Sequence, residues 1–546
     1  MRVAAGIILA IGALAAAPAQ ANDKQDFLTC DGFVHPGKQG DGLRGMAFSD
    51  RLGGLNFANV TVNACTRALA SPRLLPTQTL RRVHLLRARA AAHLRAGETK
   101  EGVADLDLAD AAAAPLAGDV FYRRSMGTSM TLLRAIATAQ SGDIHGASAL
   151  AQTAMKTRPY ALDVQLVAAK ILQADRNPGG ASPSPWAAAG RLSPNLAATA
   201  LIEEAEIGNF AAVMAMRNGV EIDWPKPKMN LMPFSEDQAT ASALMTAMLV
   251  TVHTAYARAA TGDADGARRD MAELRTRLVA LRPEGTVEKA VPTNVIAFAG
   301  LTHAQLDKFA ELRGKQVDAR IAITEKRPAD ALSALIATPM PQNAASAELL
   351  TALKAALPAD RAALVPDATP ILAEAMGKRR EQLTALVPDA LIAAETPRSV
   401  IDYSRARPNI LGALVAGALS MGTSLLGGIS RTDGFRSTNN PDGTLKVEFI
   451  GNTPSPTLVQ EMTLLRAAEL TREAGKPSFV IVKRADYSRR MVTTQYGREI
   501  GSTPTGFKSE LTIRFLDAGM EPARSLNAVG IIDALGPLYY EEKKAA

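Results

Sequence analysis

The sequence has few aromatic residues, only two cysteines and no long run of basic residues, and each of these shortages excludes something. Aromatic residues make up 4% of the 546 residues, whereas alanine, leucine and arginine are abundant, which favours helix over sheet. A net charge of +7 would suit an anionic partner. However, aromatic and basic residues are not interleaved as they are in proteins that bind single-stranded nucleic acid. We therefore expect a folded, mainly helical chain of roughly two or three domains with a basic solvated surface and no nucleic-acid partner.

Patterns typical of metal sites and catalytic centres are also missing. The histidines form no H-E-x-x-H motif and do not pair with cysteine at metal-ligand spacing. They are His35, His84, His93, His145, His253 and His303. The G-x-S-x-G motif of serine hydrolases does not occur either. The sequence therefore predicts no metal and no cofactor.

Two short patterns that resemble functional motifs have simpler interpretations. Gly40, Gly42 and Gly45 have G-x-G-x-x-G spacing, but no apolar strand leads into them, so we expect a loop. Glu469 has the chemistry of a general acid or base. Arg466 lies one turn before it, and an ion pair accounts for both residues. We therefore favour a protein that is not an enzyme.

The first 21 residues predict a secretory signal peptide. Arg2 precedes an apolar run, and Ala19-Gln20-Ala21 forms an A-x-A cleavage site. The mature chain is then expected to begin at Asn22, with no cysteine at the cleavage point to carry a lipid. This predicts an exported protein of the periplasm or cell envelope.

Cys30 and Cys65 are the only cysteines, and both lie early in the expected mature chain. An even pair in an exported protein favours a disulfide, which would contribute roughly 3–4 kcal/mol. The alternative, a reactive or metal-binding pair, needs more ligands than the segment offers. The bridge would hold residues 22–58 against the helices that follow.

Residues 134–159, RAIATAQSGDIHGASALAQTAMKTRP, predict two helices joined by a tight turn. Gly142 and Asp143 supply the break, with Asp143 placed to cap the second helix. A proline ends the unit. Small residues lie where the two helices approach each other, at Ala135, Ala147 and Ala154. One such hairpin cannot bury its own apolar faces, so copies of it are expected.

Similar units surround Gly97, Gly208 and Gly262. Two of them repeat the small or apolar positions, at Ala90, Gly102, Leu106 and Ala109 and at Ala255, Ala267, Met271 and Leu274. This pattern resembles the tetratricopeptide repeat, although its aromatic positions hold other residues and its period is irregular. The alternative is a set of ordinary alanine-rich hairpins. We expect degenerate repeats over residues 59–290. The preceding A-C-T-R-A-L is similar to exported bacterial tetratricopeptide proteins, in which this cysteine pairs with an upstream one.

The resemblance also implies a binding surface. Stacked repeats of this kind form a superhelix whose concave groove binds extended peptides or proteins. By resemblance, first-helix residues line the groove, here His84, Arg87, Ala91 and Arg95, with Tyr256 in a later unit. Such a stripe suits an acidic peptide or a C-terminal carboxylate. A solvated basic face is the alternative.

Residues 291–407 are expected to continue as helical capping or connecting elements, with residues 320–341 as a worn fifth unit. The apolar, glycine-rich segment 408–430 that follows is long enough to span a bilayer. Glycine, serine and threonine dilute its hydrophobicity. We therefore expect residues 410–429 to be packed against protein or associated with a membrane surface.

Residues 431–546 predict a small α+β module with the order β-α-β-β-α. F-I-G-N at 449–452, L-L-R-A-A-E-L-T at 464–471 and F-V-I-V at 479–482 are similar to a family of small bacterial envelope lipoprotein-like domains. That resemblance implies a location and no activity.

The sequence as a whole predicts a mainly α protein, with a solenoid of helical hairpins resembling tetratricopeptide repeats joined to the C-terminal α+β module. The expected function is a non-enzymatic interaction scaffold of the bacterial cell envelope that binds a protein or peptide ligand. The alternative is an envelope or cell-wall enzyme, or its accessory subunit.

Overall fold

The computed structural model describes residues 23–32, 60–176, 184–222, 224, 235–281, 296–298, 301–336, 341, 343–387, 392–395, 434–451, 455–495 and 498–540. The expected signal peptide, the G-x-G-x-x-G loop and the apolar run 408–430 lie outside these residues. Within the described part of the chain, no helix is both long and apolar enough to cross a membrane.

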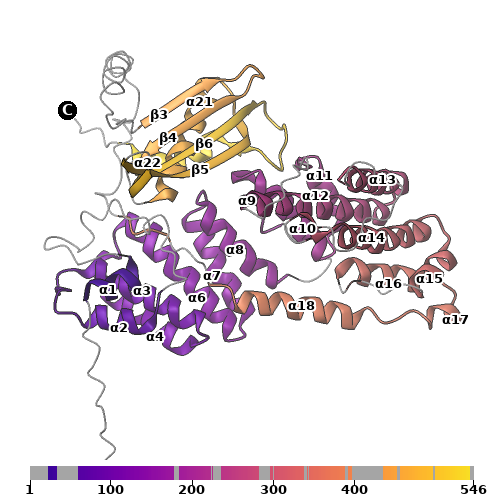
Figure 1. Cartoon of the computed structure of the whole chain (residues 1–546), viewed down its shortest axis with the longest axis horizontal. Coiled ribbons are helices and arrows are strands. Elements are labelled where there is room, and N and C mark those ends of the chain that lie inside the picture. The colour runs from indigo at the N-terminus through magenta and orange to yellow at the C-terminus, as the bar shows by residue number, and fades with distance from the viewer. Residues whose placement is uncertain are drawn as a thin grey trace, which may run out of the picture.

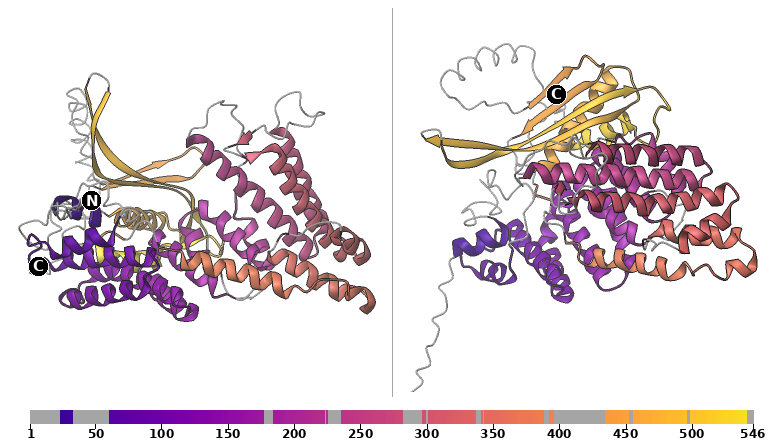
Figure 2. Two further views of the ribbon diagram at one scale, coloured as in Figure 1. Left: turned by 60° about the horizontal axis from the view of Figure 1, so that its bottom comes forward. Right: turned by 45° about the vertical axis from the view of Figure 1, so that its right-hand side comes forward.

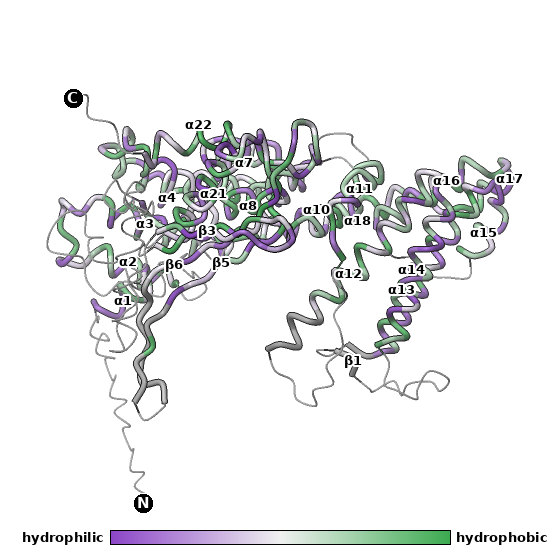
Figure 3. The backbone as a smooth tube through the Cα atoms, turned by 90° about the horizontal axis from the view of Figure 1, so that it is seen from above, coloured by the Kyte–Doolittle hydropathy of each residue, from purple (hydrophilic) through white to green (hydrophobic). Residues whose placement is uncertain are grey.

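The first group of helices, the N-terminal lobe, shares one hydrophobic core (Figure 1). Its helices are α1 (Asp23–Asp31), α2 (Val62–Ala70), α3 (Thr79–Arg95), α4 (Thr99–Ala113), α5 (Val120–Tyr122), α6 (Thr128–Gln140), α7 (Ile144–Thr157) and α8 (Leu162–Ala174). A 3-10 turn, Ala114–Leu116, and a π turn, Arg123–Gly127, flank α5. Helices α3 and α4, and likewise α6 and α7, pack as hairpins. Hydrophobic and hydrophilic residues alternate along these helices (Figure 3), as expected for helices with one buried face.

The second group, the middle lobe, has a separate core. It contains α10 (Asn195–Glu206), α11 (Phe210–Arg217), α12 (Ser235–Ala260), α13 (Ala264–Ala280), α14 (His303–Thr324), α15 (Pro328–Ile336), α16 (Ala344–Ala356) and α17 (Ala359–Ala362). The short helix α9 (Ala187–Leu192) precedes it, and Leu192 belongs to a third core, formed mainly by residues 435–539. Two short strands, β1 (Ile296–Phe298) and β2 (Leu301–Thr302), pair ahead of α14. Trp186 packs between α8 and α10 and so joins the two lobes.

The hairpin turns have a shared backbone geometry. Gly97, Gly142, Gly208 and Gly262 all have positive φ, between 78° and 100°, the conformation that glycine adopts most easily. The next residue donates its N–H to the carbonyl five positions earlier, as Asp143 does to Thr138, which is a Schellman ending. The side chain of Asp143 then caps α7 by accepting from the N–H of Gly146 at 2.8 Å. The predicted turn and cap are confirmed.

The small residues predicted at the helix contacts are buried as expected. Ala135, Ala147 and Ala154 have exposed fractions of 0%, 0% and 1%. The worn fifth unit forms the hairpin of α14 and α15, but its turn has Lys326 where the others have glycine. Lys326 has a φ of 62°, and Arg327 makes the corresponding bond to the carbonyl of Ala322 at 2.7 Å.

Helix α18 (Thr369–Thr384) crosses from the middle lobe to the N-terminal lobe (Figure 1). It contacts α16 near its start and α6 and α8 near its end. The chain then continues over the N-terminal lobe through residues 385–387 and 392–395. We call residues 369–387 and 392–395 the strap.

The C-terminal module is an antiparallel sheet with two helices. Its elements are β3 (Gly434–Asn439), β4 (Leu445–Gly451), α21 (Pro456–Glu473), β5 (Ser478–Gln495), β6 (Arg498–Leu516), β7 (Leu526–Asn527) and α22 (Ala528–Tyr539). The strand order in the sheet is β3-β4-β6-β5-β7. Strands β5 and β6 continue past β4 as a long two-stranded arm (Figure 2).

The predicted β-α-β-β-α order is confirmed for β4, α21, β5, β6 and α22, but three features were missed. The edge strands β3 and β7 were not predicted, because β3 is almost entirely polar and β7 has two residues. The two strands of the predicted β-β pair rest on the apolar segments 477–485 and 509–517, which cover only part of the hairpin of β5 and β6. Pairing in the arm continues through polar residues as far as Gln495 and Arg498.

Candidate functional site

Helix α3 carries the residues that were predicted to line an open groove. His84, Arg87 and Ala91 are 2%, 0% and 0% exposed, whereas Arg95 lies at the exposed end of the helix. The first three residues are therefore buried in this structure and do not face solvent. At Arg87 the strap, which belongs to the same chain, contributes to this burial, because Arg87 bonds to the carbonyl of Ile392.

Arg87 is held by the strap and by its own helix. Its Nη1 donates to the carbonyl of Ile392 at 2.8 Å, and its Nη2 lies 2.8 Å from His84 Nδ1. Burial lowers the pKa of Arg87 to about 10. Burial, together with the charges of Arg87 and Arg81, holds the pKa of His84 well below its usual value. At neutral pH the imidazole is thus uncharged and accepts the bond, while Arg87 stays charged and, among the residues that the structure describes, bonds to no carboxylate.

Further contacts fix the course of the strap across the N-terminal lobe. Leu383, Val387 and Ile392 belong to the same hydrophobic core as α3 to α8. The side-chain amide of Gln140, the last residue of α6, donates to the carbonyls of Leu94 at 3.0 Å and Thr384 at 2.8 Å. It thereby ties the ends of α3 and α18 together.

The strap ends on Glu395, which is bonded through both its backbone and its side chain. Its N–H donates to the hydroxyl of Ser125 at 3.1 Å. Its carboxylate accepts from Arg158 Nη2 at 2.9 Å and from the hydroxyl of Ser455 at 2.5 Å. Ser455 also caps α21 by accepting from the N–H of Leu458. Glu395 thus connects the N-terminal lobe to the C-terminal module.

The junction network is the set of buried polar residues around this contact: Arg124, Arg158, Glu395, Glu461 and Tyr539. The carboxylate of Glu461 accepts from Arg158 Nε and Nη2, both at 3.0 Å. It also accepts from Arg124 at 2.9 Å and from the hydroxyl of Tyr539 at 2.7 Å. Two arginines face two glutamates, so the buried charges compensate each other.

The protonation states of this network follow from those contacts. Burial alone would raise the pKa of Glu461, but the charges of Arg158 and Arg124, with hydrogen bonds from Arg158 and Tyr539, lower it to about 2. Burial and the two nearby glutamates raise the pKa of Tyr539 well above its usual value. At neutral pH, Glu461 is therefore ionised and Tyr539 is neutral. Such an enclosed, charge-balanced arrangement joins two parts of a fold and does not expose a reactive group.

Tyr256 of α12 is also buried and does not line an open groove. Its hydroxyl lies 2.7 Å from the carbonyl of Ala345 and 2.6 Å from the carboxylate of Glu348, both in α16. Its ring is 5.1 Å from that of Phe210. The contact with α16 is the physical reason why Tyr256 is buried.

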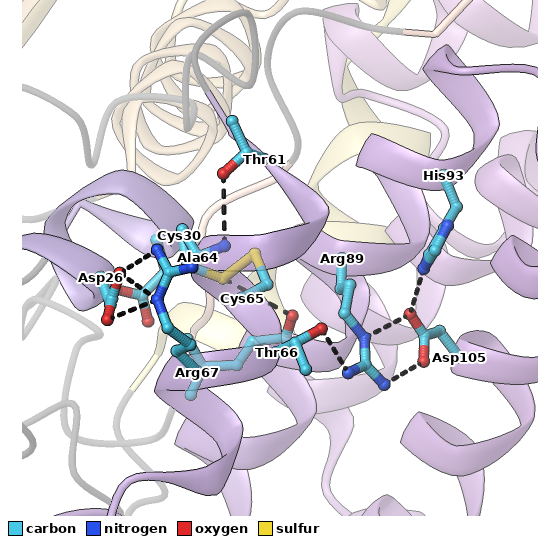
Figure 4. The surroundings of a disulfide bond; sticks show 12 residues. Asp26, Cys30, Thr61, Ala64, Cys65, Thr66, Arg67, Arg89, His93 and Asp105 are labelled. Atoms are coloured by element: carbon cyan, nitrogen blue, oxygen red, sulfur yellow. Dashed lines mark hydrogen bonds and ion pairs between the residues drawn. A yellow bond between two sulfur atoms is a disulfide. The ribbon is translucent and has the colours of Figure 1, made fainter. Parts of the chain in front are cut away.

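The predicted disulfide between Cys30 and Cys65 is confirmed (Figure 4). It joins α1 to α2 with a Cα–Cα distance of 4.8 Å. Arg67 pairs with Asp26 at 2.6 Å beside the bridge. The expected ion pair between Arg466 and Glu469 is also present, at 2.9 Å.

Sequence reasoning missed the junction network, and for Glu461 a local signal was available. Leu458 and Leu465 lie three positions before and four positions after Glu461, so all three share one face of α21. Both leucines are fully buried. A charged residue on an apolar helix face predicts a buried partner. For Arg158 and Glu395, which are 237 residues apart, no local pattern predicts the contact.

Within the described part of the chain, no group of three histidine, cysteine or acidic residues is arranged to hold a metal ion. One hollow of about 390 Å3 lies between α13 and α14. Charged residues of both signs line it, among them Lys315, which pairs with Glu311 at 2.6 Å. This mixture indicates no particular class of ligand.

Comparisons with known proteins add no relative: no family model, no curated protein and no solved structure matches the chain.

Proposed function

We propose that this chain is an exported scaffold protein of the bacterial cell envelope that has no catalytic activity. It binds a protein or peptide along the inner face of a helical solenoid of degenerate tetratricopeptide-like repeats. The recurring hairpins support the repeat assignment, because the turns at residues 97, 142, 208, 262 and 326 have a common geometry. Hairpins that share a turn and pack on their neighbours are the units of such solenoids.

One observation carries the binding function. The segment Ile392–Glu395 lies against the N-terminal lobe and is bonded through its own backbone, by Arg87 at one end and by Ser125 at the other. A surface whose side chains form hydrogen bonds with the backbone of a neighbouring segment is suited to binding extended peptides. Here the chain itself supplies the segment.

The partner is tested by capture from envelope extracts with the mature chain, residues 22–546. Wild-type protein is compared with Arg87→Met, which alters the covered face, and with Arg277→Met, which alters an exposed arginine of α13. We expect a defined partner to be retained by wild type and Arg277→Met and lost with Arg87→Met. Equal capture by all three proteins would contradict binding at this face.

The location is tested by reporters fused after Ala546. Alkaline phosphatase is active only outside the cytoplasm, so we expect it to be active in this fusion and a cytoplasm-only fluorescent protein to be dark. The opposite pattern would place the C-terminal module in the cytoplasm and make the apolar run 408–430 a membrane span.

The alternative function, an envelope enzyme or its accessory subunit, has no specific observation in its favour among the described residues. The acid and tyrosine with strongly shifted pKa values, Glu461 and Tyr539, are enclosed in the junction network. Their contacts already explain their presence.

A further inference from the structure

We propose that Ile392–Glu395 is an internal ligand of the N-terminal lobe, and that a partner gains access by displacing it with a segment of the same chemistry. This inference rests on the proposed binding function and specifies its ligand. The partner segment is extended, has an aliphatic residue followed by a small one, and has an acidic residue three positions after the aliphatic one.

The backbone contacts define the conformation of this ligand. Arg87 donates to the carbonyl of Ile392, and Ser125 accepts from the N–H of Glu395. Neither bond depends on the side chain of the bound segment. Any extended segment that places a carbonyl and an N–H at these two points can form both bonds, so a second chain can replace the first.

The side-chain contacts define the sequence of the ligand. Ile392 and Ala393 are buried, and Ile392 lies in the hydrophobic core of the lobe. Glu395 is 2% exposed and bonds to Arg158 and Ser455. The surface therefore selects a segment with an aliphatic side chain at its first position and a carboxylate at its fourth.

The buried arginines around Ile392–Glu395 favour an incoming segment that carries an acidic residue. When Glu395 leaves, Arg158 and Arg124 remain bonded to Glu461, so the network survives with one excess positive charge. Arg87 contributes a further buried positive charge, for which the described part of the chain offers no bonded carboxylate. Buried arginines that lack a full set of counter-charges are stabilised by an incoming carboxylate. The vacated surface thus attracts the kind of segment that left it.

The experiment uses a fluorescein-labelled peptide with blocked ends, DALIAAETPR, which is residues 389–398 of this chain. Its affinity is measured for the full mature chain and for the double variant Ile392→Asn/Glu395→Gln, in which the internal ligand loses its aliphatic side chain and its carboxylate while Arg158 keeps Glu461. Removing an internal competitor raises apparent affinity by the inverse of the open fraction, so we expect the double variant to bind at least about tenfold more tightly.

Two controls isolate the cause. Lys378→Gln changes an exposed residue of the strap and is expected to bind the peptide as wild type does. A peptide with glutamine in place of its glutamate is expected to lose most of its affinity. A double variant that melts like wild type but binds no more tightly would overturn the inference.

A second measurement on unaltered protein covers the case in which the double variant does not fold. Excess unlabelled peptide is added to the wild-type chain, and hydrogen exchange is followed at residues 392–395. Faster exchange there is expected, because the peptide displaces the segment. Unchanged exchange at millimolar peptide would overturn the inference.

The two proposals can fail separately. If the peptide displaces the segment but no envelope partner is captured, the internal ligand stands and the scaffold function fails. If a partner is captured at the Arg87 face but the peptide never displaces the segment, the scaffold function stands and the internal ligand fails.

Discussion

The two ends of the segment Ile392–Glu395 are held by buried arginines in different electrostatic settings. At Glu395, Arg158 is paired with two carboxylates and belongs to a charge-balanced network. At Ile392, Arg87 is equally buried, and its bonding partners within the described ranges are a carbonyl and a neutral imidazole. The first end belongs to the junction network, which joins the N-terminal lobe to the C-terminal module. At the second end, the buried positive charge of Arg87 lacks a bonded carboxylate among the described residues, so a bound anion would stabilise it.

The sharpest test of this difference is to remove each arginine in turn. Arg158→Met leaves Glu461 and Glu395 buried with only Arg124, and we expect it to reduce the free energy of unfolding by about 3–5 kcal/mol. Arg87→Met removes an uncompensated charge and two hydrogen bonds, effects that oppose each other. We expect a change within about 1 kcal/mol. Denaturant unfolding measures both, and equal losses would remove the distinction.

Lowering the pH should reduce the contribution of the junction network to the free energy of unfolding. The pKa of Glu461 in the folded protein is lowered to about 2 from an ordinary value of 4.5. Its contribution is therefore fully present above about pH 4.5 and is lost as the pH falls towards 2, amounting to about 3 kcal/mol. Unfolding followed between pH 7 and pH 2.5 measures this loss. In Glu461→Gln the corresponding part of the acid dependence should disappear, whereas in Glu473→Gln, which alters an exposed residue of α21, it should remain.

Packing in the hairpins gives a test that is independent of the strap charges. Ala147 is fully buried, so Ala147→Leu should overpack the helix interface and cost roughly 1–3 kcal/mol. Ala149 lies on the exposed face of α7, and Ala149→Leu should change stability by less than about 0.5 kcal/mol. Thermal melting compares the two. Equal melting temperatures would count against close packing of these hairpins.

The smallest effect on stability is expected at the hairpin turns. In one of them, a residue other than glycine has the positive φ that glycine adopts most easily. Lys326 has the positive φ that glycine has in the other turns. Lys326→Gly should relieve backbone strain and raise stability by about 0.5–1 kcal/mol. The reverse change, Gly142→Lys, should lower it by a similar amount, since a side chain at Gly142 meets no neighbouring atom and the cost is conformational alone. Melting temperatures that do not move apart would contradict a shared turn geometry.

Local features of this fold were predictable from the sequence. The turn at Gly142 and Asp143, the buried Ala147, the disulfide and the C-terminal strand and helix order all depend on residues close to one another or on composition. The edge strand β3 was not predictable, because its polar residues carry no alternating pattern.

The candidate site was predictable only in part. The stripe containing His84 and Arg87 was identified on α3, but its burial was not predicted. Its cover comes from Ile392, 305 residues further along the chain. No periodicity or motif reports such a contact. The same applies to Arg158 and Glu461, which are 303 residues apart.

That separation also affects how each molecule is made. Arg87 is added to the growing chain 305 residues before Ile392. At ordinary rates of protein synthesis this interval lasts about 15–60 s. During that time the surface of α3 around Arg87 has no strap to contact it. A newly synthesised chain therefore passes through a stage in which the surface around Arg87 is uncovered, and the contact between Arg87 and Ile392 closes a long loop at a correspondingly large entropic cost.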